Sequence, residues 1–185
     1  MAVPPPAPVD KKRLRAHMRS VRAGFVPAGP IPAWPAFLGR LRSGMVVATY
    51  RPIGSEAKPL RLEEAAVEAG CALALPHVVD RETPLRFLRW SEELALIAGP
   101  FGLEQPHHES DEVAPDIILT PLVAFDRGGG RLGQGAGHYD RAFAAYPHAW
   151  RVGVAWSFQE APALPADPWD VPLHAVATEK EWITP

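Results

Sequence analysis

The chain lacks the features that mark secreted, membrane-spanning and nucleic-acid-binding proteins. Cys71 is its only cysteine, so no disulfide can form within the chain, and a reducing compartment is expected. No apolar run approaches the roughly 20 residues of a membrane span, and the opening MAVPPPAPVD is unlike a signal peptide. The 19 Lys and Arg residues nearly balance 21 Asp and Glu, giving a formal net charge of −2. A cytoplasmic protein without nucleic-acid or membrane partners is therefore predicted.

Several catalytic signatures are also missing. The histidines show no spacing typical of a zinc site, and no Gly-x-Ser-x-Gly nucleophile motif occurs. The alternating glycines Gly133, Gly135 and Gly137 fit neither the P-loop pattern nor the dinucleotide pattern Gly-x-Gly-x-x-Gly, because the third glycine comes one residue too early and no P-loop lysine follows. The sequence therefore does not support a structural metal, or hydrolysis through a nucleophilic side chain.

What the chain does have is enough apolar residues, 47% of the total, for a sizeable core. Apolar runs alternate with helical patterns, which predicts an α/β fold: a three-layer sandwich with a mainly parallel sheet and helices on both faces. Residues 1–9 are expected to form a flexible, proline-rich lead-in, and residues 10–185 one domain. Strands are predicted at 45–50, 72–76, 85–90, 116–125, 151–156 and 173–178, and helices at 10–24, 36–41, 60–69 and up to about residue 146.

The first predicted helix carries two stripes. Asp10 is a plausible N-cap and Gly24 a plausible end. The apolar stripe consists of Leu14, Met18, Val21 and Phe25, and the basic stripe beside it of Lys11, Arg15, Arg19 and Arg22. A solvated amphipathic helix would explain this pattern. Alternatively, Lys11 and Arg15 lie at the rim of an anion site.

The segment RLGQGAGHYDR, residues 131–141, follows the strongest predicted core strand and leads into a helix. Ligands collect at such strand ends in open α/β sheets. Gly133, Gly135 and Gly137 would let backbone N–H groups point at a phosphate or carboxylate, and Arg131 could bind the same anion. A plain wide turn is the alternative. Asp140 could cap the following helix or hold a divalent metal beside bound phosphates.

Five segments, taken in order, resemble the 5-formyltetrahydrofolate cyclo-ligase (methenyltetrahydrofolate synthetase) family. They are KKRLR (11–15), YRPIGSE (50–56), FGLEQP (101–106), PLVAFDRGGGRLGQGAGHYDR (121–141) and DPWDVPLHAVATE (167–179). The resemblance implies conversion of 5-formyltetrahydrofolate, with or without a polyglutamate tail, to 5,10-methenyltetrahydrofolate. It also implies that ATP and Mg²⁺ are used, and that the formyl oxygen is phosphorylated to an iminium phosphate before the ring closes. A monomer is expected.

The resemblance also implies roles for individual residues. Lys11 and Arg15 would contact phosphate, Glu56 would bind the N–H edge of the pterin, and Asp140 and Asp170 would hold the metal. Arg131 and Tyr139 would be catalytic. Nucleotide-binding residues would be Lys11, Arg15, Arg131, Gly133, Gln134, Gly135, Ala136, Gly137 and Tyr139; the substrate-binding set would be Glu56, Gln134, Gly135, Ala136, Gly137 and His138.

The sequence departs from the family pattern at three positions. His138 replaces a tyrosine and is expected to titrate near neutral pH. Gln105 replaces a glutamate, and His174 stands where an acid is common and is expected to have a structural role at a strand end. Two alternatives stay open: an enzyme that activates a different N-formyl or carboxyl substrate with ATP, and a non-catalytic folate- or nucleotide-binding module on the same scaffold.

Overall fold

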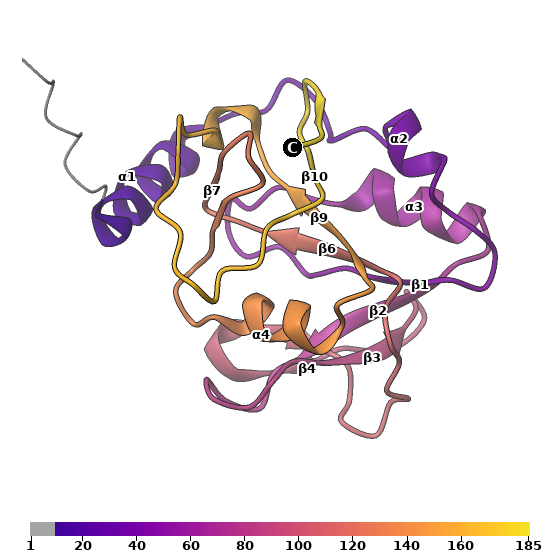
Figure 1. Cartoon of the computed structure of the whole chain (residues 1–185). Helices are drawn as coiled ribbons and strands as arrows, with labels where there is room; N and C mark the ends of the chain where they lie inside the picture. Colours follow the sequence, from indigo (N-terminus) through magenta and orange to yellow (C-terminus); the bar gives the residue numbers. More distant parts are fainter. Residues whose placement is uncertain (1–9) are drawn as a thin grey trace, which may run out of the picture.

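A seven-stranded sheet runs through the centre of the molecule in the computed structural model, which describes residues 10–185 (Figure 1). The predicted lead-in, 1–9, lies outside the described residues. In spatial order the strands are β11 (Trp182–Ile183), β10 (Ala175–Ala177), β9 (Trp150–Val154), β6 (Ile117–Pro121), β1 (Val46–Ala48), β2 (Ala72–His77) and β3 (Arg86–Trp90). The five inner strands are parallel, and both edge strands are antiparallel to their neighbours. The predicted mainly parallel sheet is confirmed.

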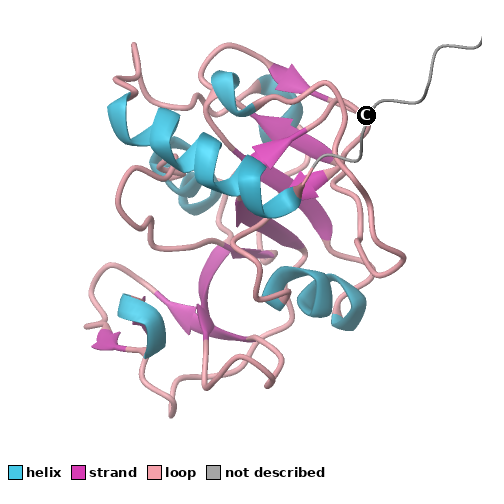
Figure 2. Cartoon of the chain, turned by 90° about the vertical axis from the view of Figure 1, so that its left-hand side faces the viewer, coloured by secondary structure: helices cyan, strands magenta, loops and turns pink. Residues whose placement is uncertain are grey.

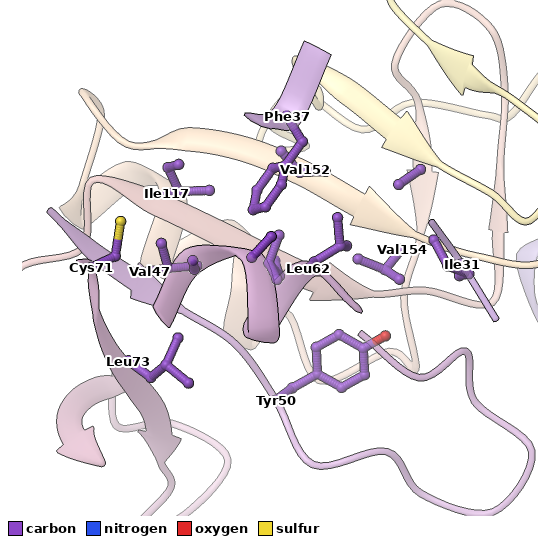
Figure 3. Close-up of a cluster of buried hydrophobic side chains, with 14 of the residues drawn as sticks. Ile31, Phe37, Val47, Tyr50, Leu62, Cys71, Leu73, Ile117, Val152 and Val154 are labelled. Carbon is purple, nitrogen blue, oxygen red and sulfur yellow. The ribbon is translucent and has the colours of Figure 1, made fainter. Parts of the chain in front are cut away.

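Helices cover both faces of this sheet because its strands bury side chains on both sides. In Figure 1, α2 (Pro35–Leu38) and α3 (Leu60–Glu68) lie above the sheet and α4 (His138–Ala145) lies below it. Val47 of β1 packs with Phe37 and Leu62 on the first face (Figure 3), while the next residue, Ala48, packs with Phe143 on the other. This alternation confirms the predicted three layers.

Helix α1 (Lys11–Gly24) faces the viewer in Figure 2 and begins and ends where the sequence predicts. The Asp10 carboxylate accepts hydrogen bonds from the backbone N–H of Lys12 at 2.8 Å and of Arg13 at 3.4 Å, so the predicted N-cap is confirmed. The predicted apolar stripe is partly wrong. Val21 is 41% exposed, whereas Arg22 is buried and donates to Ser55 Oγ and to the Leu122 carbonyl.

The predicted strand 116–125 is in fact two strands. Pro121 has no N–H to continue the ladder, and β6 ends there. The chain leaves the main sheet, and β7 (Ala124–Phe125) pairs with β8 (Arg131–Leu132) in a separate hairpin. Asp126 accepts hydrogen bonds from the N–H groups of Gly128 and Gly130 and so fixes the turn. Met18 of α1 packs on this hairpin.

Four short elements were not predicted. They are the pair β4 (Ile97–Ala98) and β5 (Glu104–Gln105), and the 3-10 turns η1 (Pro100–Gly102) and η2 (Ser157–Gln159). The hairpin β7–β8 and the edge strand β11 were also missed. The strands β7, β8 and β11 have two residues each, which is too short for a periodic signal. From residue 10 onward, no helix is both long and apolar enough to cross a membrane.

Gly129, in the β7–β8 turn, gives a test of how this hairpin holds the C-terminal part of the chain. Its φ is +83°, and an added Cβ would lie 2.8 Å from the Leu173 carbonyl oxygen. We expect Gly129→Ala to lower the free energy of unfolding by about 3 kcal/mol, from backbone strain and from displacement of Leu173. Gly44→Ala is the matched control, because φ is +87° there but no atom lies within 4 Å; it should cost about 1 kcal/mol. Equal losses in urea unfolding would contradict the steric argument.

Candidate active site

The site lies between β1 and β6, where the order in which the chain adds strands to the sheet reverses. From β1 the chain proceeds outward to β2 and β3, whereas from β6 it proceeds the other way to β9 and β10. The loops after β1 and β6 therefore diverge, and they leave a crevice at the carboxyl ends of these two strands. A cavity of about 560 Å³ opens there. It is lined by every predicted site residue: Lys11, Arg15, Glu56, Arg131, Gly133, Gln134, Gly135, Ala136, Gly137, His138, Tyr139, Asp140 and Asp170.

The glycine segment is bent by two left-handed residues. Gly135 has φ +108° and Gly137 has φ +69°, conformations that other residues rarely adopt. Gly137 also precedes α4 as its N-cap residue, without a side-chain cap. Arg15 donates from Nε to the Gly133 carbonyl at 2.8 Å, so α1 is tied to this segment. This geometry brings the predicted anion contacts together on one wall of the cavity.

A buried carboxylate faces the middle of the glycine segment. Glu56 is 6% exposed; it accepts a hydrogen bond from Gln134 Nε2 at 3.1 Å and another from the Ile53 N–H at 3.1 Å. Burial, and then the charge of Glu56, raise the pKa of the phenols of Tyr50 and Tyr139, which remain neutral at physiological pH. A fixed acceptor beside two neutral phenols suits a ligand edge rich in N–H donors.

Asp140 does not cap α4, so the helix-cap interpretation is wrong. Its Oδ1 instead accepts a hydrogen bond from Arg131 Nη2 and a longer one, 3.5 Å, from the Val171 N–H. The Arg131 side chain is only 5% exposed, and its guanidinium lies over the Phe143 ring at 5.0 Å. In the cavity wall, Arg131 is therefore paired with Asp140 through Nη2. Its Nε is buried and has no hydrogen-bond partner among the described residues.

Lys11 joins α1 to the loop before β10. Its Nζ lies 2.7 Å from Asp167 Oδ2 and 2.9 Å from Asp170 Oδ2. Burial tends to lower the pKa of Lys11, but the two carboxylates outweigh it and raise the pKa. Burial likewise opposes the shift at Asp170, where the Asp167 N–H and Lys11 nevertheless lower the pKa below its usual value. Lys11 and Asp170 are therefore charged at neutral pH.

The residues present fit a magnesium ion. Asp140 Oδ2 and Asp170 Oδ1 make no hydrogen bond to any residue in 10–185, and both residues face the cavity. Carboxylate oxygens are ligands that Mg²⁺ prefers, usually with water or phosphate oxygens completing the octahedron. Within the described part of the chain, no group of three or more His, Cys, Asp or Glu residues could hold a metal. The pair would therefore need oxygens from a bound ligand or from water.

The three departures from the family pattern have different surroundings. Burial, and then Arg141, lower the pKa of His138, so it titrates at more acidic pH than the sequence suggests. Gln105 is buried and accepts a hydrogen bond from the Val78 N–H at 2.9 Å, which gives it a structural contact. His174 Nδ1 accepts one from the Arg151 N–H at 3.0 Å beside the start of β10.

Sequence reasoning missed several residues of the cavity wall. They include Tyr50, Arg51, Arg81, Phe101, Leu103, Asp167 and Trp169. Most of them lie in the segments YRPIGSE, FGLEQP and DPWD, whose order was recognised although no role was assigned to these positions. Arg51 is held in the wall by Glu63, at 2.9 Å, and by the Trp90 ring, 4.3 Å from the centroid.

The fold and the cavity define an α/β protein with a cavity at a sheet switch point, between a glycine segment and a pair of carboxylates. The family model of the 5-formyltetrahydrofolate cyclo-ligase family matches residues 35–179. The 5-formyltetrahydrofolate cyclo-ligase of Mycolicibacterium smegmatis is 32% identical over an alignment of 189 residues. The alignment covers 96% of this chain and 97% of that one. The chain belongs to the 5-formyltetrahydrofolate cyclo-ligase family, as its resemblance predicted.

One solved structure agrees with this assignment, and a second shares the fold. The 5,10-methenyltetrahydrofolate synthetase of Aquifex aeolicus superposes with a TM-score of 0.74 and 30% identity, covering 94% of this chain and 92% of that one. The fold is also shared by the synthetase of Mycoplasma pneumoniae, at a TM-score of 0.66 and 22% identity over 92% of this chain and 99% of that one. Lys11 and Arg15 lie before the first residue that the family model matches.

The Arg131–Asp140 pair predicts a difference between two substitutions. Asp140→Ala leaves the buried Arg131 guanidinium without its partner, and should lower the free energy of unfolding by about 3 kcal/mol. Asp140→Asn keeps an acceptor oxygen in place and should cost about 1 kcal/mol. Urea unfolding without nucleotide or metal measures both values. Equal losses would mean that the pair does not stabilise Arg131.

Proposed function

We propose that this protein uses ATP and Mg²⁺ to cyclise 5-formyltetrahydrofolate to 5,10-methenyltetrahydrofolate, releasing ADP and phosphate. Family membership gives the cyclo-ligase class. The observation that carries the rest is that one cavity collects the glycine segment, the buried Glu56 and the Asp140–Asp170 pair. We further propose that the protein acts as a monomer in the cytoplasm and accepts folate with or without a polyglutamate tail.

The chemistry explains why such a cavity suffices. The oxygen of the N5-formyl group is a poor leaving group, so the γ-phosphoryl group of ATP is transferred to it. N10 then attacks the formyl carbon and loses its proton, the five-membered ring closes, and the C–O bond breaks so that its electron pair leaves with the phosphate. Each step needs reactants held in line and developing charge stabilised, but no nucleophilic side chain.

The phosphate contacts would come from α1 and the glycine segment. Lys11, Arg15 and the bent backbone of Gly133, Gly135 and Gly137 line the same cavity, and Arg15 contacts the Gly133 carbonyl at 2.8 Å. Arg131, held by Asp140, would stabilise charge on the transferred group. Tyr139, the second proposed catalytic residue, is kept protonated by burial and could donate its hydroxyl proton in a hydrogen bond.

The pterin contacts would come from Glu56 and Gln134. The Glu56 carboxylate can accept hydrogen bonds from the N–H edge of the ring, and Gln134 holds it in place. Asp140 and Asp170 would hold Mg²⁺, which when bound neutralises charge on the triphosphate. Lys11, beside Asp170, keeps that carboxylate oriented.

A near-ultraviolet assay tests the proposal directly. Purified protein with 5-formyltetrahydrofolate, Mg²⁺ and ATP should develop the methenyltetrahydrofolate absorbance band, and the mixture without ATP should not. Asp140→Asn should lower turnover by at least about 100-fold while the protein stays folded, because one metal ligand loses its charge. Circular dichroism provides the folding control. An equally active Asp140→Asn would contradict the metal role, and a flat wild-type trace would favour another substrate or a non-catalytic binding module.

Two further substitutions should distinguish the proposed pterin contact from the proposed phosphate contact. Glu56→Gln should raise KM for 5-formyltetrahydrofolate by about tenfold or more and change KM for ATP little, because a carboxylate contact to the pterin is lost. Lys11→Met should do the reverse, because it removes a phosphate contact. Steady-state kinetics with each substrate varied in turn measures both effects. If either variant changed both KM values equally, the assigned contact would be wrong.

A further inference from the structure

Two aromatic side chains stand exposed at the cavity, on different loops. Phe101, in η1, is 57% exposed, and Trp169, in the loop before β10, is 68% exposed. They are the most exposed Phe, Trp or Tyr residues in the described part of the chain. Arg81 lies over the Phe101 ring, at 5.4 Å, whereas Trp169 has no aromatic or cationic partner among residues 10–185. An uncovered indole at a cavity mouth offers a flat surface to a ligand.

Hydrogen bonds hold the backbone around Trp169, although its ring is exposed. The Asp167 N–H donates to Asp170 Oδ2 at 2.8 Å, and the Asp170 N–H donates to the Asp167 carbonyl at 3.0 Å. Both carboxylates bind Lys11, and the Val171 N–H reaches Asp140 at 3.5 Å. The turn 167–170 therefore holds Trp169 in place, so that stacking costs little backbone ordering.

Helix α1 shows which end of the cavity Trp169 occupies. Four of its basic residues contact successive parts of the wall: Lys11 contacts the turn 167–170, Arg15 contacts Gly133, Arg19 contacts Gln134, and Arg22 contacts Ser55, the neighbour of Glu56. At 1.5 Å per residue, Lys11 and Arg22 are about 16 Å apart along the helix axis. Trp169 thus lies at the end of the cavity opposite to Glu56.

We propose that Trp169 stacks on the purine ring of ATP and so determines specificity for an adenine-type nucleotide over a bare polyphosphate. The inference rests on the proposed function, which puts the triphosphate against Lys11, Arg15 and the glycine segment. The pterin, bound at Glu56, occupies one end and the γ-phosphate must meet its formyl group, so the base extends toward the other end. Stacking of a base on an aromatic side chain changes affinity by about tenfold.

Kinetics of two variants test the stacking. Trp169→Ala should raise KM for ATP by about tenfold and leave KM for 5-formyltetrahydrofolate nearly unchanged, whereas Trp169→Phe, which keeps a ring, should lie close to wild type. Inhibition by inorganic tripolyphosphate, which has no base, should be the same in wild type and Trp169→Ala. Stronger tripolyphosphate inhibition of the wild type would mean that Trp169 supports the phosphate contacts, and would overturn the proposal. A rise in the folate KM instead would overturn it in favour of a folate ring.

Intrinsic fluorescence gives a readout that does not need turnover. ADP should quench the fluorescence of the wild type, and Trp169→Phe should lose this quenching while its KM for ATP stays near the wild-type value. Trp182→Phe is the matched control, because Trp182 packs on Trp150 in the β9–β11 part of the sheet and lies outside the cavity wall; it should keep the quenching. If ADP quenches through Trp169 but no methenyltetrahydrofolate forms, the nucleotide subsite stands and the proposed reaction fails. If turnover is normal and Trp169 is not quenched, only the stacking fails.

Discussion

The parallel pairing of β1 with β6 is the constraint on which the rest of the molecule depends. The chain leaves these adjacent strands in opposite directions across the sheet, so their following loops separate and no element fills the space between their ends. Both strands are buried between helical layers and cannot shift without exposing one apolar face. The cavity is thus a consequence of strand order, and the loops after β1 and β6 supply Glu56 and the glycine segment.

Helix α1 contacts several loops of the cavity wall and holds them in place. Its basic side chains are spaced by about one turn, and each meets a different loop, from Asp167 and Asp170 to Ser55. One rigid element therefore sets the distances between loops that come from distant parts of the chain. The charges are balanced within the wall: Lys11 is paired with two carboxylates and Arg131 with one. This pairing lets the cavity keep charged groups in place before any ligand arrives.

Local signals were sufficient for most of the fold. The 3.6-residue period of α1, its Asp10 cap and the apolar runs of β1, β2, β6 and β9 all lie where the sequence places them. Failures occurred where tertiary contacts overrode the local pattern. Val21 is exposed and Arg22 buried because the end of α1 lies over the Leu122 carbonyl, and the strand expected through Phe125 divides after Pro121 because β7 finds its partner in β8.

For the site, the sequence alone determined the residue types and their order: a glycine segment after a core strand, separated carboxylates and a basic helix, which together sufficed to indicate the family. Only the tertiary structure decided which of these groups meet. Lys11 and Asp167 are 156 positions apart, so no periodicity relates them, and Asp140 binds Arg131 instead of capping α4 because β8 brings that guanidinium to the start of the helix. Local spacing governs backbone conformation, whereas contacts between distant residues depend on the order of strands in the sheet.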